Sequence, residues 1–158
     1  FKQKTAYEIP KRDWSSDVCS SDLTKEIRNM KTCLIAGAGG YTPENLVPWI
    51  NSIKNTNYSG DIIVFVYDPV DDSVQEYLKD NGVKVITYGW QKETNIATQR
   101  FLDYANLLSS DHGKDYDYVI SVDIRDVIFQ KDPDKWVREN IGDKEIIASG
   151  EEIGRAHV

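Results

Sequence analysis

The sequence contains few of the residues that build disulfides and zinc centres. Two cysteines and two histidines occur among 158 residues. Cys33 lies in an apolar run, Thr-Cys-Leu-Ile-Ala, and is predicted to be a small buried residue. Cys33 and His112 alone supply too few ligands for a zinc site. Cys19 and His157 lie near the two ends of the chain, in segments that are unlike ordinary protein sequence. The sequence therefore predicts neither a disulfide framework nor a zinc centre.

Long apolar runs and an excess of positive charge are also missing. No run approaches the roughly 20 residues that a membrane helix needs, so we expect no membrane segment in this piece. Lysine and arginine total 19 against 26 acidic residues, and the net charge of −7 argues against nucleic acid as a partner. A phosphate-bearing ligand held through a metal ion stays compatible with this charge. The location stays open: it is cytoplasmic or, if the source is eukaryotic, the Golgi lumen with an anchor lost upstream.

Both ends of the chain are unlike ordinary protein sequence. Residues 13–23, Asp-Trp-Ser-Ser-Asp-Val-Cys-Ser-Ser-Asp-Leu, resemble a translated short-read sequencing adapter, and residues 2–9 fit the flow-cell end of that adapter. Residues 153–158, Ile-Gly-Arg-Ala-His-Val, fit its reverse complement. We therefore expect 1–23 and 153–158 to be adapter-derived and exclude them from fold reasoning. The informative segment is then 24–152, which we expect to be part of a larger domain.

Strand and helix signals alternate along this segment. Continuous apolar runs closed by glycines or turn residues are typical of strands buried on both faces. Thr42 followed by Pro43 is typical of a helix start. Strands are expected at 32–38, 61–67, 83–87, 117–122 and 144–149, and helices at 43–53, at 73–81, from Thr94 or Asn95 to 108, and from Asp132 and Pro133 onward.

This order predicts an α/β fold, with a Rossmann-like, mostly parallel sheet and helices on both faces. Helical spacing predicts one buried face for the helix that ends near 108, formed by Ile96, Arg100, Tyr104 and Leu108 and widened by Phe101 and Ala105. The same spacing predicts that Trp136 and Val137 point inward from the last helix.

In such a sheet the ligand lies beyond the carboxyl ends of the strands. Gly37 follows the first strand, but a dinucleotide fingerprint that starts there needs a third glycine where Thr42 stands. Asp68 precedes a proline and is typical of a turn residue. Trp90 is expected to be a packing residue and His112 an exposed loop residue. These places favour structural roles.

Two acids follow the fourth predicted strand directly. Asp123 and Asp126 come after the run Tyr-Val-Ile-Ser-Val and precede a second apolar run. Carboxylates on a short turn at the ligand edge make a hard-oxygen site for Mg²⁺ or Mn²⁺, which normally keeps positions open for phosphate oxygens. Such an ion can bridge a diphosphate and neutralise it as it leaves. The structural alternative is an acidic turn paired internally with Arg125.

Residues 32–149 resemble the nucleotide-binding half of a GT-A type glycosyltransferase, a nucleotide-diphospho-sugar transferase. The resemblance rests on the first strand with Val-Pro-Trp-Ile-Asn-Ser-Ile-Lys, on Tyr-Ser-Gly-Asp-Ile-Ile-Val-Phe from 58, on Arg-Phe-Leu-Asp-Tyr from 100, and above all on Tyr-Val-Ile-Ser-Val-Asp-Ile-Arg-Asp-Val-Ile-Phe-Gln-Lys-Asp-Pro from 118. In that family an Asp-x-Asp motif binds a divalent metal and the donor's diphosphate.

The chain departs from a strict Asp-x-Asp because Arg125 takes the third position and the second acid arrives at 126. The resemblance implies Asp123 and Asp126 as metal ligands, with the direct one left open. It implies Arg125 as a diphosphate contact or as a partner of an acid, and Arg100 as a donor contact or a structural salt bridge. The loop of Ala38, Gly39, Gly40 and Tyr41 is where the family receives the base and ribose.

The implied activity is transfer of a sugar from a nucleotide diphosphate to an acceptor hydroxyl, assisted by Mn²⁺ or Mg²⁺. In the family the acceptor site and catalytic base usually lie downstream of the motif, so catalytic residues stay unassigned and the piece is expected to be inactive alone. A Rossmann-type oxidoreductase would instead use the glycine loop and Asp68. A non-catalytic α/β module would bind no nucleotide.

Overall fold

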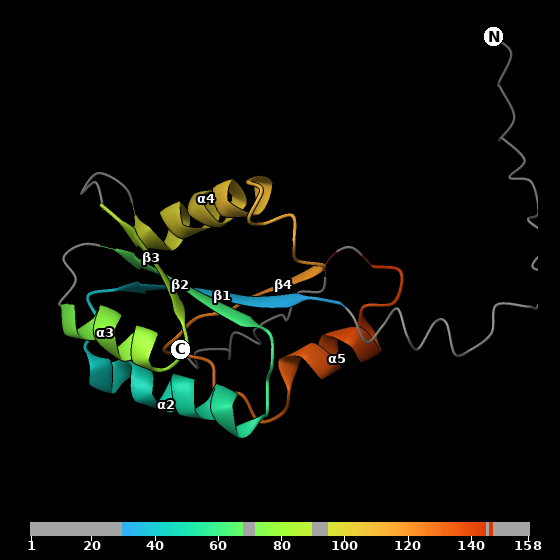
Figure 1. The fold of residues 1–158 in the computed structure, drawn as a ribbon, viewed down its shortest axis with the longest axis horizontal. Coiled ribbons are helices and arrows are strands. Elements are labelled where there is room, and N and C mark those ends of the chain that lie inside the picture. Colours follow the sequence, from blue (N-terminus) through green and yellow to red (C-terminus); the bar gives the residue numbers. More distant parts are fainter. Residues whose placement is uncertain (1–29, 68–71, 90–94, 145, 147–158) are drawn as a thin grey trace, which may run out of the picture.

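The computed structural model describes residues 30–67, 72–89, 95–144 and 146. Within them the chain forms an α/β fold of alternating strands and helices (Figure 1). The elements are β1 (Thr32–Gly39), α2 (Pro43–Asn55), β2 (Asp61–Tyr67), α3 (Asp72–Asp80), β3 (Lys84–Tyr88), α4 (Ile96–Ser109), β4 (Tyr118–Ser121) and α5 (Pro133–Asn140). No described helix has the length and apolar character needed to cross a membrane.

The described strands form one parallel sheet in the order β3-β2-β1-β4. β1 lies at the centre, where Cys33–Gly39 pair with Asp61–Tyr67 of β2 and Thr32–Ile35 pair with Tyr118–Ser121 of β4. Parallel strands that are neighbours in a sheet need a crossover connection, and the helices between the strands supply it. The predicted Rossmann-like parallel sheet is confirmed.

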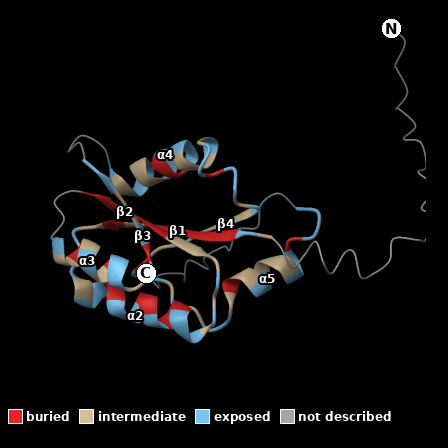
Figure 2. Ribbon diagram, viewed as in Figure 1, coloured by how far each residue is buried: buried red, intermediate tan, exposed pale blue. Residues whose placement is uncertain are grey.

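Helices cover both faces of the sheet, as predicted. In Figure 1, α4 lies on one face and α2, α3 and α5 lie on the other. Alternate residues of a strand point to opposite faces, so Leu34 and Ala36 join a core with α2 and α3, while Cys33 and Ile35 join a second core with Tyr104 of α4. The central strands are therefore buried along most of their length (Figure 2).

Helix starts follow the predicted capping residues. Pro43 begins α2, and the backbone N–H of Thr42 donates to Asn45 Oδ1 at 3.0 Å. Asn95 caps α4 by accepting from the backbone N–H of Ala97 at 2.9 Å. Asp132 caps α5 by accepting from that of Asp134 at 3.0 Å. A side chain that satisfies a free N–H of the first turn stabilises a helix by about 1 kcal/mol.

Two packing predictions for helices are wrong, and several other predictions concern residues outside the described ranges. Phe101 is 54% exposed and Ala105 is also exposed, so they do not widen the buried face of α4. Trp136 is 50% exposed and does not point into the core, because α5 packs beside β4 rather than under the centre of the sheet. Most of the predicted strand 144–149, together with Asp68 and Trp90, lies outside the described residues.

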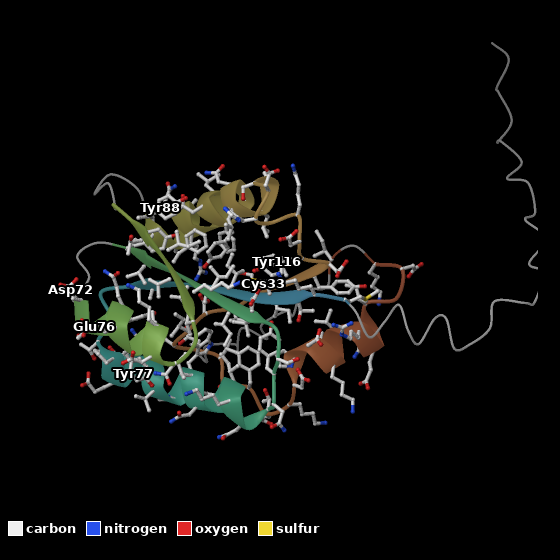
Figure 3. All side chains as sticks on the ribbon, in the orientation of Figure 1. Cys33, Asp72, Glu76, Tyr77, Tyr88 and Tyr116 are labelled. Atoms are coloured by element: carbon white, nitrogen blue, oxygen red, sulfur yellow. The ribbon has the colours of Figure 1, made fainter. Side chains whose placement is uncertain are left out.

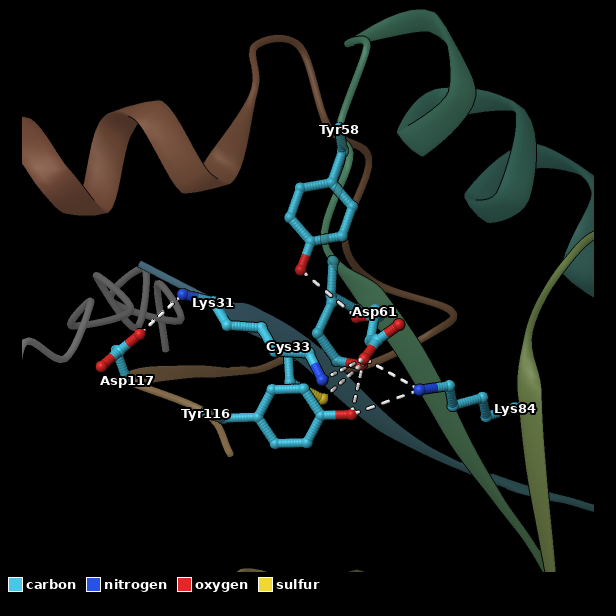
Figure 4. Close-up of polar contacts among 8 residues, drawn as sticks. Lys31, Cys33, Tyr58, Asp61, Lys84, Tyr116 and Asp117 are labelled. Carbon is cyan, nitrogen blue, oxygen red and sulfur yellow. Dashed lines mark hydrogen bonds and ion pairs between the residues drawn. The ribbon is translucent and has the colours of Figure 1, made fainter. Parts of the chain in front are cut away.

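The amino ends of the strands meet around Asp61. Its Oδ2 accepts a hydrogen bond from the Tyr116 hydroxyl at 2.7 Å and forms ion pairs with Lys84 Nζ at 2.8 Å and Lys31 Nζ at 3.5 Å (Figure 4). Cys33 is fully buried in this region, and burial, with the negative charge of Asp61, raises the pKa of its thiol to about 12. The predicted structural role of Cys33 is confirmed.

Replacing Asp61 with asparagine is expected to remove an acid-sensitive part of the stability. Burial acts to raise the pKa of Asp61, but hydrogen bonds from Lys84 and Tyr116 outweigh it, so this pKa lies below its ordinary value. The carboxylate therefore stabilises the fold above the unfolded-state pKa of about 3.9 and loses this effect as the pH falls through the lower folded-state pKa.

Thermal unfolding of wild type and Asp61→Asn across pH checks this expectation. We expect the variant to be less stable by about 1 kcal/mol at pH 7. The difference in Tm should hold down to about pH 5 and shrink below about pH 4. A difference as large at pH 2.5 as at pH 7 would contradict the assigned role.

Candidate functional site

The turn after β4 presents two acids at the carboxyl edge of the sheet. β4 ends at Ser121, and the backbone N–H of Val122 still donates to the Ile35 carbonyl of β1 at 3.2 Å. Ile124 is 2% exposed and belongs to the core that α2 and α3 complete. Asp123, whose side chain is 47% exposed, and the exposed Asp126 flank this anchor. The buried isoleucine thus fixes a turn from which both carboxylates reach solvent.

Arg100 of α4 contacts the first of these acids. Its Nη1 forms an ion pair and hydrogen bond with Asp123 Oδ1, and the Arg100 side chain is only 20% exposed. Hydrogen bonding to Asp123 raises the pKa of Arg100, so the guanidinium stays charged. Arg100 Nε is buried and has no hydrogen-bond partner among the described residues. Arg125 is exposed and forms no ion pair within the described residues, so the internal pairing anticipated for it belongs to Arg100 instead.

Buried polar side chains lie on the same helix, and among them Asp103, like its partner Gln99, was not singled out from the sequence. Asp103 is 3% exposed and accepts hydrogen bonds from the Tyr67 hydroxyl at 2.9 Å and from Gln99 Nε2 at 3.0 Å. Burial, followed by the bond to Asp103, raises the pKa of Tyr67. Tyr104 is 5% exposed, and its hydroxyl has no partner among the described residues. In the sequence, the spacing of Gln99 and Asp103, four residues apart, was the signal that could have predicted their hydrogen bond on one helix face.

Aromatic rings fill the space between α4 and the sheet beside this polar group. Phe65 and Tyr88 stack with their centroids 5.6 Å apart, and Tyr104 lies 5.1 Å from Phe65. Figure 3 shows Tyr88 on the side of the sheet that faces α4. The rings hold α4 close to β1 and β2, which keeps Arg100 in reach of the turn after β4.

Glycines of β1 allow this close approach. A Cβ at Gly37 would lie 3.1 Å from the Tyr104 hydroxyl, and one at Gly39 would lie 2.9 Å from Ile96. Gly40 has a φ of +66°, a conformation that favours glycine. Ala38 is 2% exposed within the core, so only its backbone can face a ligand. Tyr41 is half-buried against the same core.

The described residues offer Asp123 and Asp126 as the oxygen donors for a cation at this edge. No group of three or more histidine, cysteine or acidic side chains within the described ranges is placed to hold a metal. Two carboxylates on one exposed turn fit an ion such as Mg²⁺, which binds through one or two carboxylates and keeps its other positions for water and phosphate oxygens. They do not fit a closed structural site.

A cavity lies elsewhere, between β4 and α5. It has a volume of about 540 Å³ and is lined mainly by apolar side chains, among them Phe129, Trp136 and Ile141. Lys131 and Asp117 are its charged lining residues, and neither Asp123 nor Arg100 faces it. We place the candidate site at the carboxyl edge because Arg100 contacts Asp123 there and the buried Arg100 Nε has no hydrogen-bond partner among the described residues.

Comparison with protein-family models and with curated proteins finds no match to this chain. Its function must therefore be inferred from the residues at the carboxyl edge.

Proposed function

We propose that the chain is the donor-binding part of a glycosyltransferase that uses a nucleotide-diphospho-sugar and a divalent cation. The observation that carries this proposal is the pair Asp123 and Asp126 on the turn after β4, with Arg100 in contact with Asp123. Carboxylates for a cation and a guanidinium for phosphate oxygens, side by side at the carboxyl edge of a parallel sheet, suit a diphosphate ligand.

Each group has a role that its chemistry supports. Asp123 and Asp126 would hold Mn²⁺ or Mg²⁺, which neutralises the diphosphate as it leaves the sugar. Arg100 supplies a positive charge in a partly buried place, and Arg125 supplies a second one from the exposed turn. The loop of Gly39, Gly40 and Tyr41 lies at the carboxyl end of β1, the strand that pairs with β4 through Thr32–Ile35, and a base and ribose can be received there.

Calorimetric titration of the chain with UDP and with GDP, with and without Mn²⁺, tests this proposal. We expect one of the two nucleotides to bind in the presence of Mn²⁺ and to bind at least about 100-fold more weakly without it, a difference of about 2.8 kcal/mol. NAD binding with the same affinity in the presence and absence of Mn²⁺ would favour the oxidoreductase alternative. Absence of any nucleotide binding would favour a non-catalytic module.

A further inference from the structure

The ion pair between Arg100 and Asp123 occupies an oxygen that a cation at this edge needs. Asp123 offers two carboxylate oxygens, and Arg100 Nη1 takes Oδ1. Asp123 is the more buried of the two acids on the turn, with a side chain 47% exposed, whereas Asp126 is exposed. A divalent cation bound to Asp123 would therefore lie within a few ångströms of a guanidinium that cannot lose its charge.

The guanidinium also has hydrogen-bonding capacity to spare. Arg100 carries five N–H donors, of which Nη1 is used on Asp123 and the buried Nε has no partner among the described residues. A buried donor without a partner is uncommon in folded proteins and costs stability unless a ligand or water satisfies it. A diphosphate brought in by the cation would supply anionic acceptors at this place.

We propose that Arg100 is an exchangeable counter-ion of Asp123. A divalent cation displaces Arg100 from Asp123, and the freed guanidinium then binds the diphosphate. The inference rests on the proposed function and adds a coupling between its two ligands. In the free chain Arg100 competes with the cation for Asp123, so it weakens binding of the cation alone. Once the cation is bound, the freed guanidinium strengthens binding of the nucleotide. One side chain thus acts in opposite directions on the two ligands.

Arg100→Gln tests this exchange through two binding measurements on the chain. Mn²⁺ binding without nucleotide, followed by electron paramagnetic resonance, should become about two- to fivefold tighter in the variant, as expected for losing an ion pair of partial exposure. UDP or GDP binding at saturating Mn²⁺ should become about tenfold weaker, because a charge-assisted hydrogen bond is lost. Lys114→Gln removes an exposed charge in the loop that precedes β4, where Lys114 pairs with Asp111, and should alter neither affinity.

Arg100→Lys is the second variant. It keeps the positive charge, so it can be measured even if the glutamine variant folds poorly. It should leave Mn²⁺ binding within about twofold of wild type and still weaken nucleotide binding, because lysine lacks the planar fork of arginine. Unchanged or weaker Mn²⁺ binding by a folded Arg100→Gln chain, or unchanged nucleotide binding, would overturn the exchange while leaving the proposed function intact. A wild-type chain that binds no nucleotide with Mn²⁺ would overturn the proposed function itself.

Discussion

Replacing Asp126 with alanine is expected to weaken metal-dependent binding of a nucleoside diphosphate by about 100-fold or more. The proposed cation has two protein ligands within the described residues, and Asp126 is the one without a competing ion pair. Removing a residue that only orients a metal ligand costs about 10- to 100-fold in affinity, so removing one of two carboxylate ligands should cost at least as much. Calorimetry with Mn²⁺ and the preferred nucleotide measures the effect.

The matched control for this prediction is Asp111→Ala. Asp111 is an acid with a side chain 94% exposed, and its ion-pair partner among the described residues is Lys114, three residues away. Its replacement changes the net charge by the same amount, and we expect it to leave nucleotide binding within about twofold because exposed pairs of this kind contribute little. Equal weakening in both variants would mean that overall charge, rather than a ligand at 126, controls binding.

Replacing Trp49 with alanine is expected to lower the free energy of unfolding by about 3–5 kcal/mol, the cost of emptying a large core position. Trp49 is fully buried on α2, in the core that α2 and α3 form with the sheet. Its indole N–H has no hydrogen-bond partner among the described residues, so Trp49→Phe, which removes that N–H and keeps most of the ring, should cost much less. Chemical denaturation of both variants measures the difference.

Trp136→Ala is the control for the Trp49 prediction. The residue type is the same, but Trp136 is 50% exposed on α5. Because the stabilisation from burial scales with the apolar area removed from water, its loss should be about half that of Trp49 or less. If Trp136→Ala proved as destabilising as Trp49→Ala, then α5 would contribute to the core in a way that the described contacts do not show.

Strands and helix starts were predictable because local chemistry determines them. The run 61–67 is apolar without alternation, as expected for a strand covered on both faces, and it is β2 with the same bounds. Asn95 and Asp132 precede their helices because their side chains satisfy a free N–H group of the first turn, and Thr42 precedes α2 with its own N–H bonded to Asn45. These signals act over a few residues and need no knowledge of the packing.

The orientation of helices was less predictable because packing overrides the hydrophobic pattern. On α4 the buried positions include Asp103, which a hydrophobicity pattern assigns to solvent, while Phe101 is left exposed. Asp103 can be buried because Tyr67, from a different element, donates to it. Trp136 is half-exposed because its helix lies at the edge of the described sheet.

The position of the candidate site was predictable from the sequence, but the arginine that pairs with its acids was not. Parallel topology requires Gly39, Asp123 and Asp126 to follow strand ends at one edge, which the order of elements already indicates. The sequence indicated Arg125 as the internal partner of the acids and gave Arg100 only as a donor contact or a structural salt bridge with no partner assigned. The choice of Arg100 depends on the glycines of β1, which let α4 come close to the sheet.

Paramagnetic broadening of backbone amide signals by Mn²⁺ in the presence of UDP or GDP tests the central claim most directly. If the site is the carboxyl edge, substoichiometric Mn²⁺ should broaden the amides of 39–41 and 122–126 most strongly. The effect should fall along the strands toward Lys31, Asp61 and Lys84 at the amino edge. Strongest broadening at the amino edge, or beside the cavity between β4 and α5, would contradict the account.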